Sequence, residues 1–143
     1  MNVKSILAGK GGDVISVEPV ATLAAAAKLL AKHKIGAVVI KGPGGRLVGI
    51  LSERDIVRAL AEFGEKALDQ PVGQVMTREV ETCGEEDTVA VIMERMTTRK
   101  FRHLPVITKG KLVGLVSIGD VVKQRVEEIE GETEAMRDYI RTA

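Results

Sequence analysis

The sequence is poor in the residues that build several common kinds of site. It contains one cysteine, Cys83, and no tryptophan, and Phe63, Phe101 and Tyr139 are its only aromatic residues. A single thiol excludes an internal disulfide and any site with several cysteine ligands. Three scattered rings provide no stacking platform of the kind that single-stranded nucleic acid sites use. The composition therefore disfavours multi-thiolate metal proteins and single-strand binders.

The charge is balanced and the apolar runs are short. The 143 residues include 21 Lys and Arg against 20 Asp and Glu, a net charge of +1, so no general field attracts a polyanion. The longest apolar runs, such as residues 23–27 and 37–40, are far shorter than the roughly 20 residues that cross a bilayer. The N-terminus has no secretory pattern. We expect a soluble, cytoplasmic protein without nucleic-acid or membrane partners.

The chain contains two copies of one pattern. Residues 14–60 match residues 80–125 at an offset of 66 that falls to 65 after one loop deletion. In the best-matched stretch, residues 45–57 against 110–122, seven of thirteen pairs are identical. Each copy reads as a short strand, a helix, a hairpin of two strands and a second helix. Because one such unit is too small to be stable alone, we expect the two copies to pack as a pseudo-twofold pair.

Apolar spacing locates the elements of each copy. Strands are predicted over residues 14–17, 37–40, 47–51, 104–107 and 112–116. The first helix of each copy has apolar residues at i, i+3, i+4 and i+7, which are Leu23, Ala26, Ala27, Leu30 and then Val89, Ile92, Met93, Met96. The second helices have Ile56, Val57, Leu60, Phe63 and then Val121, Val122, Val126, Ile129.

These patterns predict five segments. They are an N-terminal segment (1–13), repeat 1 (14–64), a linker (65–79), repeat 2 (80–130) and a C-terminal helical tail (131–143). The tail is acidic and ends in Met136, Tyr139 and Ile140 at helical spacing, which predicts a solvated face with a small docking stripe. The glycine clusters at 9–12 and 42–45 lack the spacing of a phosphate-binding P-loop, so we expect loops there.

Three motifs resemble those of one family. Gly-apolar-apolar-Ser-x-x-Asp occurs at residues 49–55 and again at 114–120, Val-Met-Thr at 75–77, and Arg-His-Leu-Pro-Val at 102–106. With the duplication, the chain resembles a CBS-domain pair (Bateman module) over nearly its whole length. The resemblance implies a mixed α/β (α+β) fold of tandem CBS repeats, each β-α-β-β-α, packed as a pseudo-twofold pair.

The two Ser-x-x-Asp segments allow two interpretations. Ser52 to Asp55 and Ser117 to Asp120 each stand between a predicted strand and a helix. As a capping box, the serine would accept from an early helical N–H while the carboxylate reaches back. As a ligand site, the helix N-terminus would favour an anion and the aspartate would accept both hydroxyls of a ribose. We expect the ribose role for at least one of the two aspartates.

The resemblance also implies which residues bind the ligand, because in the family each cleft is built from both copies. One cleft would use Ser117, Gly119 and Asp120 with Ser16, Ala21, Ile35 and Gly36. The other would use Ser52, Arg54 and Asp55 with Thr82 and His103. Arg54, Arg102 and His103 are the candidates for phosphate contacts, although Arg102 and His103 could instead be structural residues of the hairpin. His33 is predicted to be a surface residue that ends a helix.

No metal site or catalytic group is expected, because the two histidines and Cys83 have no partners in the sequence that would form one. The resemblance implies a sensor that binds an adenosine-containing ligand, with AMP first and ADP, ATP or NAD(H) as alternatives. It would act as a homodimer or through an unidentified effector protein. Two other hypotheses stay open, namely a ligand-free interaction module that regulates a partner enzyme, and a small enzyme.

Overall fold

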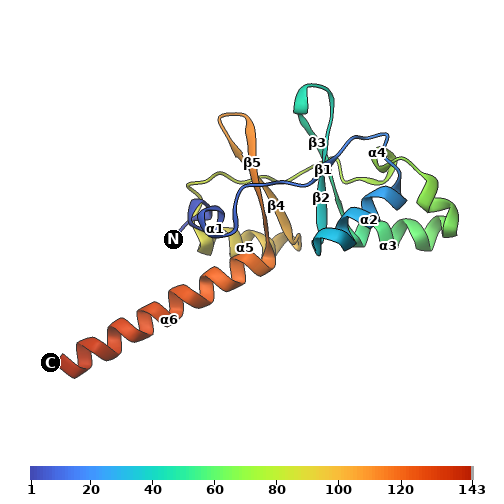
Figure 1. Ribbon diagram of the computed structural model, residues 1–143. Helices are drawn as coiled ribbons and strands as arrows, with labels where there is room; N and C mark the ends of the chain where they lie inside the picture. Colours follow the sequence, from blue (N-terminus) through green and yellow to red (C-terminus); the bar gives the residue numbers. More distant parts are fainter. Residues whose placement is uncertain (143) are drawn as a thin grey trace. The chain divides into compact units, whose positions relative to one another are not determined.

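A computed structural model describes residues 1–142, and the chain divides into two compact units. The central unit comprises residues 13–81. The terminal unit combines residues 1–12 with the chain from residue 82 onward. The α/β (α+β) fold class predicted from the sequence is confirmed, because each unit is a small sheet covered by helices (Figure 1).

The central unit is built on a three-stranded sheet. Its strands are β1 (Ser16–Val17), β2 (Ala37–Lys41) and β3 (Leu47–Ser52), in the order β1-β2-β3. β1 is parallel to β2, whereas β2 and β3 form an antiparallel hairpin. The glycine-rich segment between β2 and β3 forms the predicted turn, with a short 3-10 helix η1 (Pro43–Gly45). Helices α2 (Leu23–His33) and α3 (Glu53–Phe63) follow β1 and β3, as the apolar spacing predicted.

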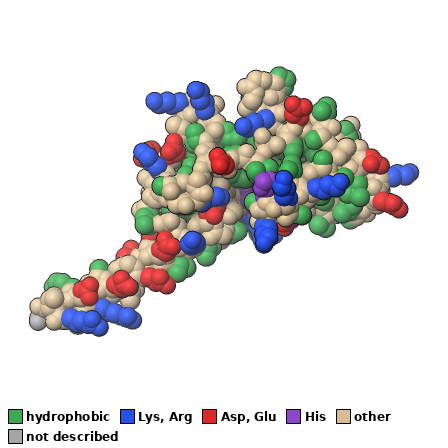
Figure 2. All heavy atoms as spheres, in the orientation of Figure 1, with side chains coloured by type: hydrophobic (Ala, Val, Ile, Leu, Met, Phe, Trp, Pro, Cys, Tyr) green, Lys and Arg blue, Asp and Glu red, His purple; other side chains and the backbone are tan. Residues whose placement is uncertain are grey.

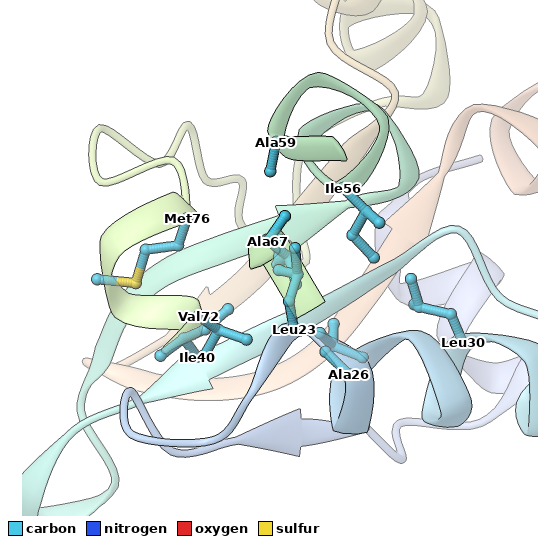
Figure 3. Packing of buried hydrophobic residues seen from close by; sticks show 11 residues of the cluster. Leu23, Ala26, Leu30, Ile40, Ile56, Ala59, Ala67, Val72 and Met76 are labelled. Atoms are coloured by element: carbon cyan, nitrogen blue, oxygen red, sulfur yellow. The ribbon is translucent and has the colours of Figure 1, made fainter. Parts of the chain in front are cut away.

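The core of the central unit includes more than the repeat pattern. α2 and α3 contribute Leu23, Ala26, Leu30, Ile56 and Ala59, as Figure 3 shows. The segment predicted as a linker forms a 3-10 helix η2 (Gly64–Asp69) and a short helix α4 (Val72–Val75). Ala67 and Val72 from this segment are fully buried in the same core. The linker is therefore part of the folded unit, because its apolar side chains belong to the same core.

The terminal unit repeats this plan with one strand fewer. It contains α1 (Val3–Lys10), α5 (Val89–Arg99), β4 (His103–Thr108), β5 (Lys111–Ser117) and α6 (Ile118–Thr142). β4 and β5 form an antiparallel hairpin. The counterpart of β1 is a single bridge between Cys83 and Val106. Residues 9 and 10, predicted as a loop, instead complete α1, and the turn falls at Gly11 with φ of 94°.

α1 packs in the terminal unit although it precedes the first repeat in the sequence. Val3 and Ile6 are buried in the core of this unit, and the Val3 N–H donates to the Asp87 carbonyl over 2.9 Å. Leu7 lies directly over Gly114 of β5, just as Met76 lies over Gly49 of β3 in the central unit. Each hairpin is thus covered by a short helix at an equivalent place.

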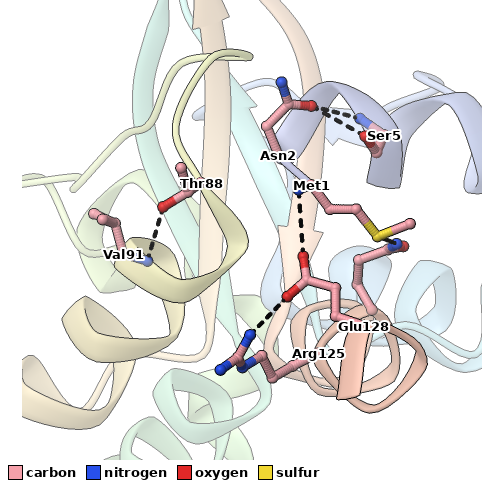
Figure 4. A network of polar contacts seen from close by, with 8 residues as sticks. Met1, Asn2, Ser5, Thr88, Val91, Arg125 and Glu128 are labelled. Carbon is pink, nitrogen blue, oxygen red and sulfur yellow. Dashed lines mark hydrogen bonds and ion pairs between the residues drawn. The ribbon is translucent and has the colours of Figure 1, made fainter. Parts of the chain in front are cut away.

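α6 is a single helix of 25 residues (Figure 1). Its first half is attached to the start of the chain, because Glu128 contacts both the Met1 ammonium at 3.5 Å and Arg125 at 2.9 Å (Figure 4). From residue 129 to residue 142 every side chain is exposed. Acidic side chains are spread along this part, and basic side chains gather near its end (Figure 2). The predicted tail boundary at residue 131 falls inside this helix, and Ala143 lies outside the described residues.

None of the helices within residues 1–142 has the length and apolar character that crossing a membrane requires.

Candidate functional site: the two Ser-x-x-Asp corners

The first corner lies where β3 ends and α3 begins. Ser52 is the N-cap, and its Oγ accepts from the Asp55 N–H at 3.4 Å. Asp55 Oδ2 accepts in return from the Ser52 N–H at 2.9 Å. The Glu53 N–H donates to the Gly36 carbonyl over 3.0 Å, which ties the helix start to the segment before β2. This corner is a complete capping box, in which the orphan amides of the helix start have partners.

Asp55 has no carboxylate oxygen left for a ligand. Its side chain is buried, with 4% of the residue exposed. Besides the capping contacts of Oδ2, Oδ1 accepts from Arg58 Nη1 at 3.3 Å and from Thr77 Oγ1 at 3.4 Å. Burying a carboxylate costs less free energy when donors satisfy its oxygens. The geometry of this corner therefore fits the structural interpretation of Ser-x-x-Asp.

The second corner has the same backbone arrangement at the start of α6. The Asp120 N–H donates to Ser117 Oγ at 3.3 Å, and Asp120 Oδ2 accepts from the Ser117 N–H at 2.9 Å. The Ile118 N–H donates to the Arg102 carbonyl over 2.8 Å, as Glu53 does to Gly36. The two corners are thus built alike from equivalent positions of the two hairpins.

The surroundings of Asp120 differ from those of Asp55. Its side chain is 24% exposed, and Lys10 Nζ donates to its Oδ2 at 2.7 Å. The same ammonium donates to the Leu115 carbonyl at 2.9 Å. Within residues 1–142, no hydrogen bond reaches Asp120 Oδ1. This carboxylate therefore keeps an acceptor oxygen at a partly exposed helix N-terminus.

Two opposing effects set the pKa of Asp120. Partial burial raises it, because desolvation disfavours the charged form. The hydrogen bond and charge of Lys10, with the hydrogen bonds from Ser117, outweigh that effect, so the pKa of Asp120 lies below its ordinary value. The carboxyl is therefore an anion at neutral pH, which is the form that accepts two hydroxyl donors.

The other predicted residues of the central unit lie on strand ends and loops. Ser16 belongs to β1, opposite Val39, and borders an open groove of about 820 Å³ that is lined by residues 16–20 and 41–45. Ala21 lies before α2, and its carbonyl accepts from the Val72 N–H at 2.7 Å. Ile35 lies half-buried beside Gly36. Arg54 is exposed on the first turn of α3.

In the terminal unit the predicted residues gather around the second corner. His103 is half-buried and pairs with Ser117 across the β4–β5 hairpin. Arg102 is exposed, and its carbonyl caps the α6 start. Gly119 is exposed on the first turn of α6. Thr82 lies further along, with its carbonyl bound to Arg95 Nη2 at 3.0 Å. The predicted clefts each combine residues of both units, and that combination stays a prediction.

Sequence reasoning missed two residues of these corners, Lys10 and Thr77. Lys10 belongs to the glycine cluster that predicts a loop, and Thr77 belongs to the Val-Met-Thr motif without a predicted contact. A detectable signal existed, because the apolar positions of residues 3–7, Val-Lys-Ser-Ile-Leu, repeat in residues 72–76, Val-Gly-Gln-Val-Met. This short match identifies α1 and α4 as equivalent helices that bring Lys10 and Thr77 to equivalent corners.

The family model for the CBS domain matches residues 3–62 and 72–127. With the duplicated fold and the two corners, this match shows that the chain belongs to the CBS-domain family. Among curated relatives, an uncharacterized 17.7 kDa protein of Acidianus ambivalens is 40% identical over 77% of this chain and 66% of its own length. The mitochondrial CBS domain-containing protein CBSX3 of Arabidopsis thaliana is 38% identical over 81% of this chain and 58% of its own.

The chain spans less than two thirds of the length of these curated relatives. It matches several solved structures over nearly their whole length. A CBS-domain containing protein from Agrobacterium tumefaciens is 46% identical, covers 87% of this chain and 92% of its own, and has a TM-score of 0.85. A CBS domain protein from Pyrobaculum aerophilum complexed with AMP is 32% identical over 93% and 99%, with a TM-score of 0.79. The CBS domain pair of protein MJ0100, in complex with 5′-methylthioadenosine and S-adenosyl-L-methionine, is 29% identical over 90% and 98%, also at 0.79.

Proposed function

We propose that this chain is a regulatory module, without a reaction of its own, that binds an adenosine-containing ligand and signals through a second copy or an effector protein. The family membership supports a binding module. Two similar structures contain AMP or a pair of adenosyl sulfur compounds, so the shared chemistry is the adenosine group. AMP is the first candidate for this chain, followed by ADP, ATP, NAD(H) and the adenosyl sulfur compounds.

The observation that carries the proposal is the difference between the two aspartates. Asp55 is buried with both oxygens bound, whereas Asp120 is partly exposed and has an oxygen without a hydrogen bond from residues 1–142. Vicinal ribose hydroxyls donate two hydrogen bonds, which a carboxylate accepts well. We therefore assign ribose binding to Asp120, with Ser117 and Gly119 beside it. The Ser52–Asp55 corner has the capping role.

Lys10 gives this corner a cation that the sequence prediction lacked. Its ammonium stands at Asp120 and has three donors, of which one binds Asp120 and one binds the Leu115 carbonyl. A phosphate attached to the ribose would find a positive charge here, and exposed Arg102 provides a second. Ser16, Ala21, Ile35 and Gly36 stay in the proposal as adenine-facing residues on the resemblance alone.

One observation favours the ligand-free interaction module as the second candidate. The Asp55 corner is saturated by its own chain, which shows that Ser-x-x-Asp in this sequence can serve the fold alone. If Asp120 also acts only as a cap, both corners are structural. The exposed apolar residues of α3 and α6, among them Val57, Phe63 and Val122, would then be the functional surface.

A thermal-melting series with a panel of adenosine ligands separates these candidates. A ligand at about a hundred times its Kd adds about 2.7 kcal/mol to the free energy of unfolding, which raises the Tm of a domain of this size by several degrees. We expect at least one panel member to raise the Tm. Asp120→Asn should abolish that shift, whereas the matched variant Asp55→Asn should keep it.

Three outcomes would contradict the proposal. If no panel member moves the Tm and calorimetric titration shows no heat of binding, the ligand-free module is correct. If Asp120→Asn binds as the unsubstituted protein does, the ribose lies elsewhere. Chromatography of each nucleotide after incubation with the purified protein should show no product, and turnover that depends on Asp120 would make the chain an enzyme.

A further inference from the structure

α6 exposes an apolar stripe that no other part of the described chain covers. Five apolar side chains on this helix have between 44% and 68% of their surface exposed, namely Val122, Val126, Ile129, Met136 and Ile140. Isolated exposed apolar residues need no explanation, but a continuous stripe of them indicates an interaction surface. The stripe runs along the helix from its first turns to its last.

The spacing of the stripe is that of a coiled coil. With Ile118 and Thr133 added, the positions of the stripe are 118, 122, 126, 129, 133, 136 and 140. They follow one another at intervals of four, four, three, four, three and four residues. From residue 122 onward these are the d and a positions of three consecutive heptads, with Val126, Thr133 and Ile140 at a and Val122, Ile129 and Met136 at d. A mean period of 3.5 suits a left-handed supercoil of parallel helices.

The stripe is distinct from the face that holds α6 in its own unit. That face contains buried Val121 and half-buried Glu128, which bonds to the start of the chain. Both lie at c positions, about 100° around the helix from the d positions and about 160° from the a positions at 3.6 residues per turn. α6 can therefore stay packed in the terminal unit while the stripe meets another helix.

The charges beside the stripe select the partner and its direction. In a parallel pair of α6 helices, each g residue faces the e residue five positions later on the other chain. Arg125 then faces Glu130, and Glu132 faces Arg137, so both kinds of pair are attractive. In the fully overlapped antiparallel pair, Glu130 faces Glu130, Glu132 faces Glu132 and Lys123 faces Arg137, all repulsive. A second copy in parallel orientation is the complementary partner.

The end of α6 also needs such a partner to be a stable helix. Residues 129–142 are exposed on all sides, so no core of their own unit supports them. An isolated helix of this length is marginal in water, and Gly131 lowers its stability further. We propose that two copies of this chain associate through α6 as a parallel coiled coil over residues 122–142.

Cysteine cross-linking tests the register and direction of the pair. Thr133→Cys places a thiol at an a position, where the two copies of one residue are close only in a parallel, in-register pair. Ala135→Cys places a thiol at an exposed c position and is the matched control. Native Cys83 is buried, so it does not interfere. With oxidised glutathione, we expect a covalent dimer from Thr133→Cys and none from Ala135→Cys. No dimer, or equal amounts from both, would overturn the proposal.

Substitutions on the helix surface test the same association without a cross-link. Ile129→Asp introduces a charge into the seam and should halve the mass measured by light scattering, with loss of helical circular dichroism. Ala135→Asp should do neither. Glu132→Arg and Arg137→Glu should each weaken the dimer, and the double variant should restore it.

A trimeric mass, or a charge reversal that strengthens the assembly, would overturn the parallel pair. Ile129→Asp that remains dimeric, together with a negative cross-linking result, would assign the association to another surface. All these residues are exposed in one copy, so the variants are not expected to disturb the core.

Discussion

Lys10 Nζ donates to Asp120 Oδ2 over 2.7 Å across 110 positions of the sequence. The contact joins the end of α1 to the start of α6, so the N-terminal segment determines the charge around the corner that we assign to ribose. Lys10 is the side-chain donor to Asp120 from outside its capping box, whereas Thr77 and Arg58 are the donors of that kind to Asp55. The two repeats thus place different side chains around their equivalent aspartates.

The ion pair predicts a pH dependence of stability. Because the pKa of Asp120 is lower in the folded chain than its unfolded value of about 3.9, its contribution is present above that pH and is lost as the pH falls through the folded pKa. Lys10→Met should lower the free energy of unfolding by about 0.5–1 kcal/mol at pH 7, since both side chains are partly solvated. Urea unfolding at pH 7 and pH 3 measures this. An equal deficit at both pH values would contradict it.

The buried corner predicts a larger effect for Asp55. Asp55→Ala removes the capping contacts and leaves the Thr77 hydroxyl and the Ser52 amide without an acceptor, so we expect a loss of about 1–3 kcal/mol. Arg58→Ala should cost under about 0.5 kcal/mol, because its side chain is 71% exposed. Guanidinium unfolding compares the two variants. A larger loss for Arg58→Ala would show that the ion pair, not the cap, stabilises the corner.

The close approach of α1 to β5 predicts that a side chain at Gly114 displaces Leu7. A Cβ at Gly114 would lie 2.6 Å from Leu7 Cδ2, so Gly114→Ala requires the Leu7 side chain to move and should destabilise the chain by about 1 kcal/mol. Leu7→Ala alone should also destabilise it through a lost contact. The double variant should be more stable than the sum of the two predicts. Additive losses in thermal unfolding would show that the cost of Gly114→Ala does not come from its contact with Leu7.

The single thiol predicts a reactivity test of the terminal core. Burial, reinforced by the charge of Asp87, raises the pKa of Cys83 to about 12. At pH 8 the folded thiol is therefore almost wholly protonated, and it should react with a disulfide reagent far more slowly than in guanidinium. A colour assay of the thiol that the reagent releases, with the folded protein at pH 8 and with the protein in guanidinium, measures the two rates. Equal rates would show that the core around β4 opens readily.

The sequence predicted the helices whose apolar residues recur at the spacing of one buried face. α2 and α5 lie where the apolar spacing placed them, because Leu23 and Val89 begin faces that are fully buried. The hairpins were found because turn glycines separate β-branched runs. The repeat pattern predicts a strand before α5. In the structure one bridge at Cys83 stands where β1 pairs with β2 in the central unit.

The site was less predictable, since the spacing of Ser-x-x-Asp does not distinguish a cap from a ligand. The burial of Asp55 and the partial exposure of Asp120 depend on what α4 and α1 bring to each corner. Those contacts are made by residues far apart in the sequence, and the short match between residues 3–7 and 72–76 is the signal that indicates them. The family resemblance named both aspartates as candidates, and our proposal that Asp120 rather than Asp55 binds the ribose rests on these contacts.

The position of α1 also determines the order in which the chain can become structured during synthesis. Residues 13–81 contain every residue of their own core, so these contacts become available before the second repeat is made. The contacts of Lys10 do not, because Leu115 and Asp120, to which it donates, are made 105 and 110 residues later. Residues 1–12 therefore lack the surface on which they pack until the ribosome has completed the second hairpin.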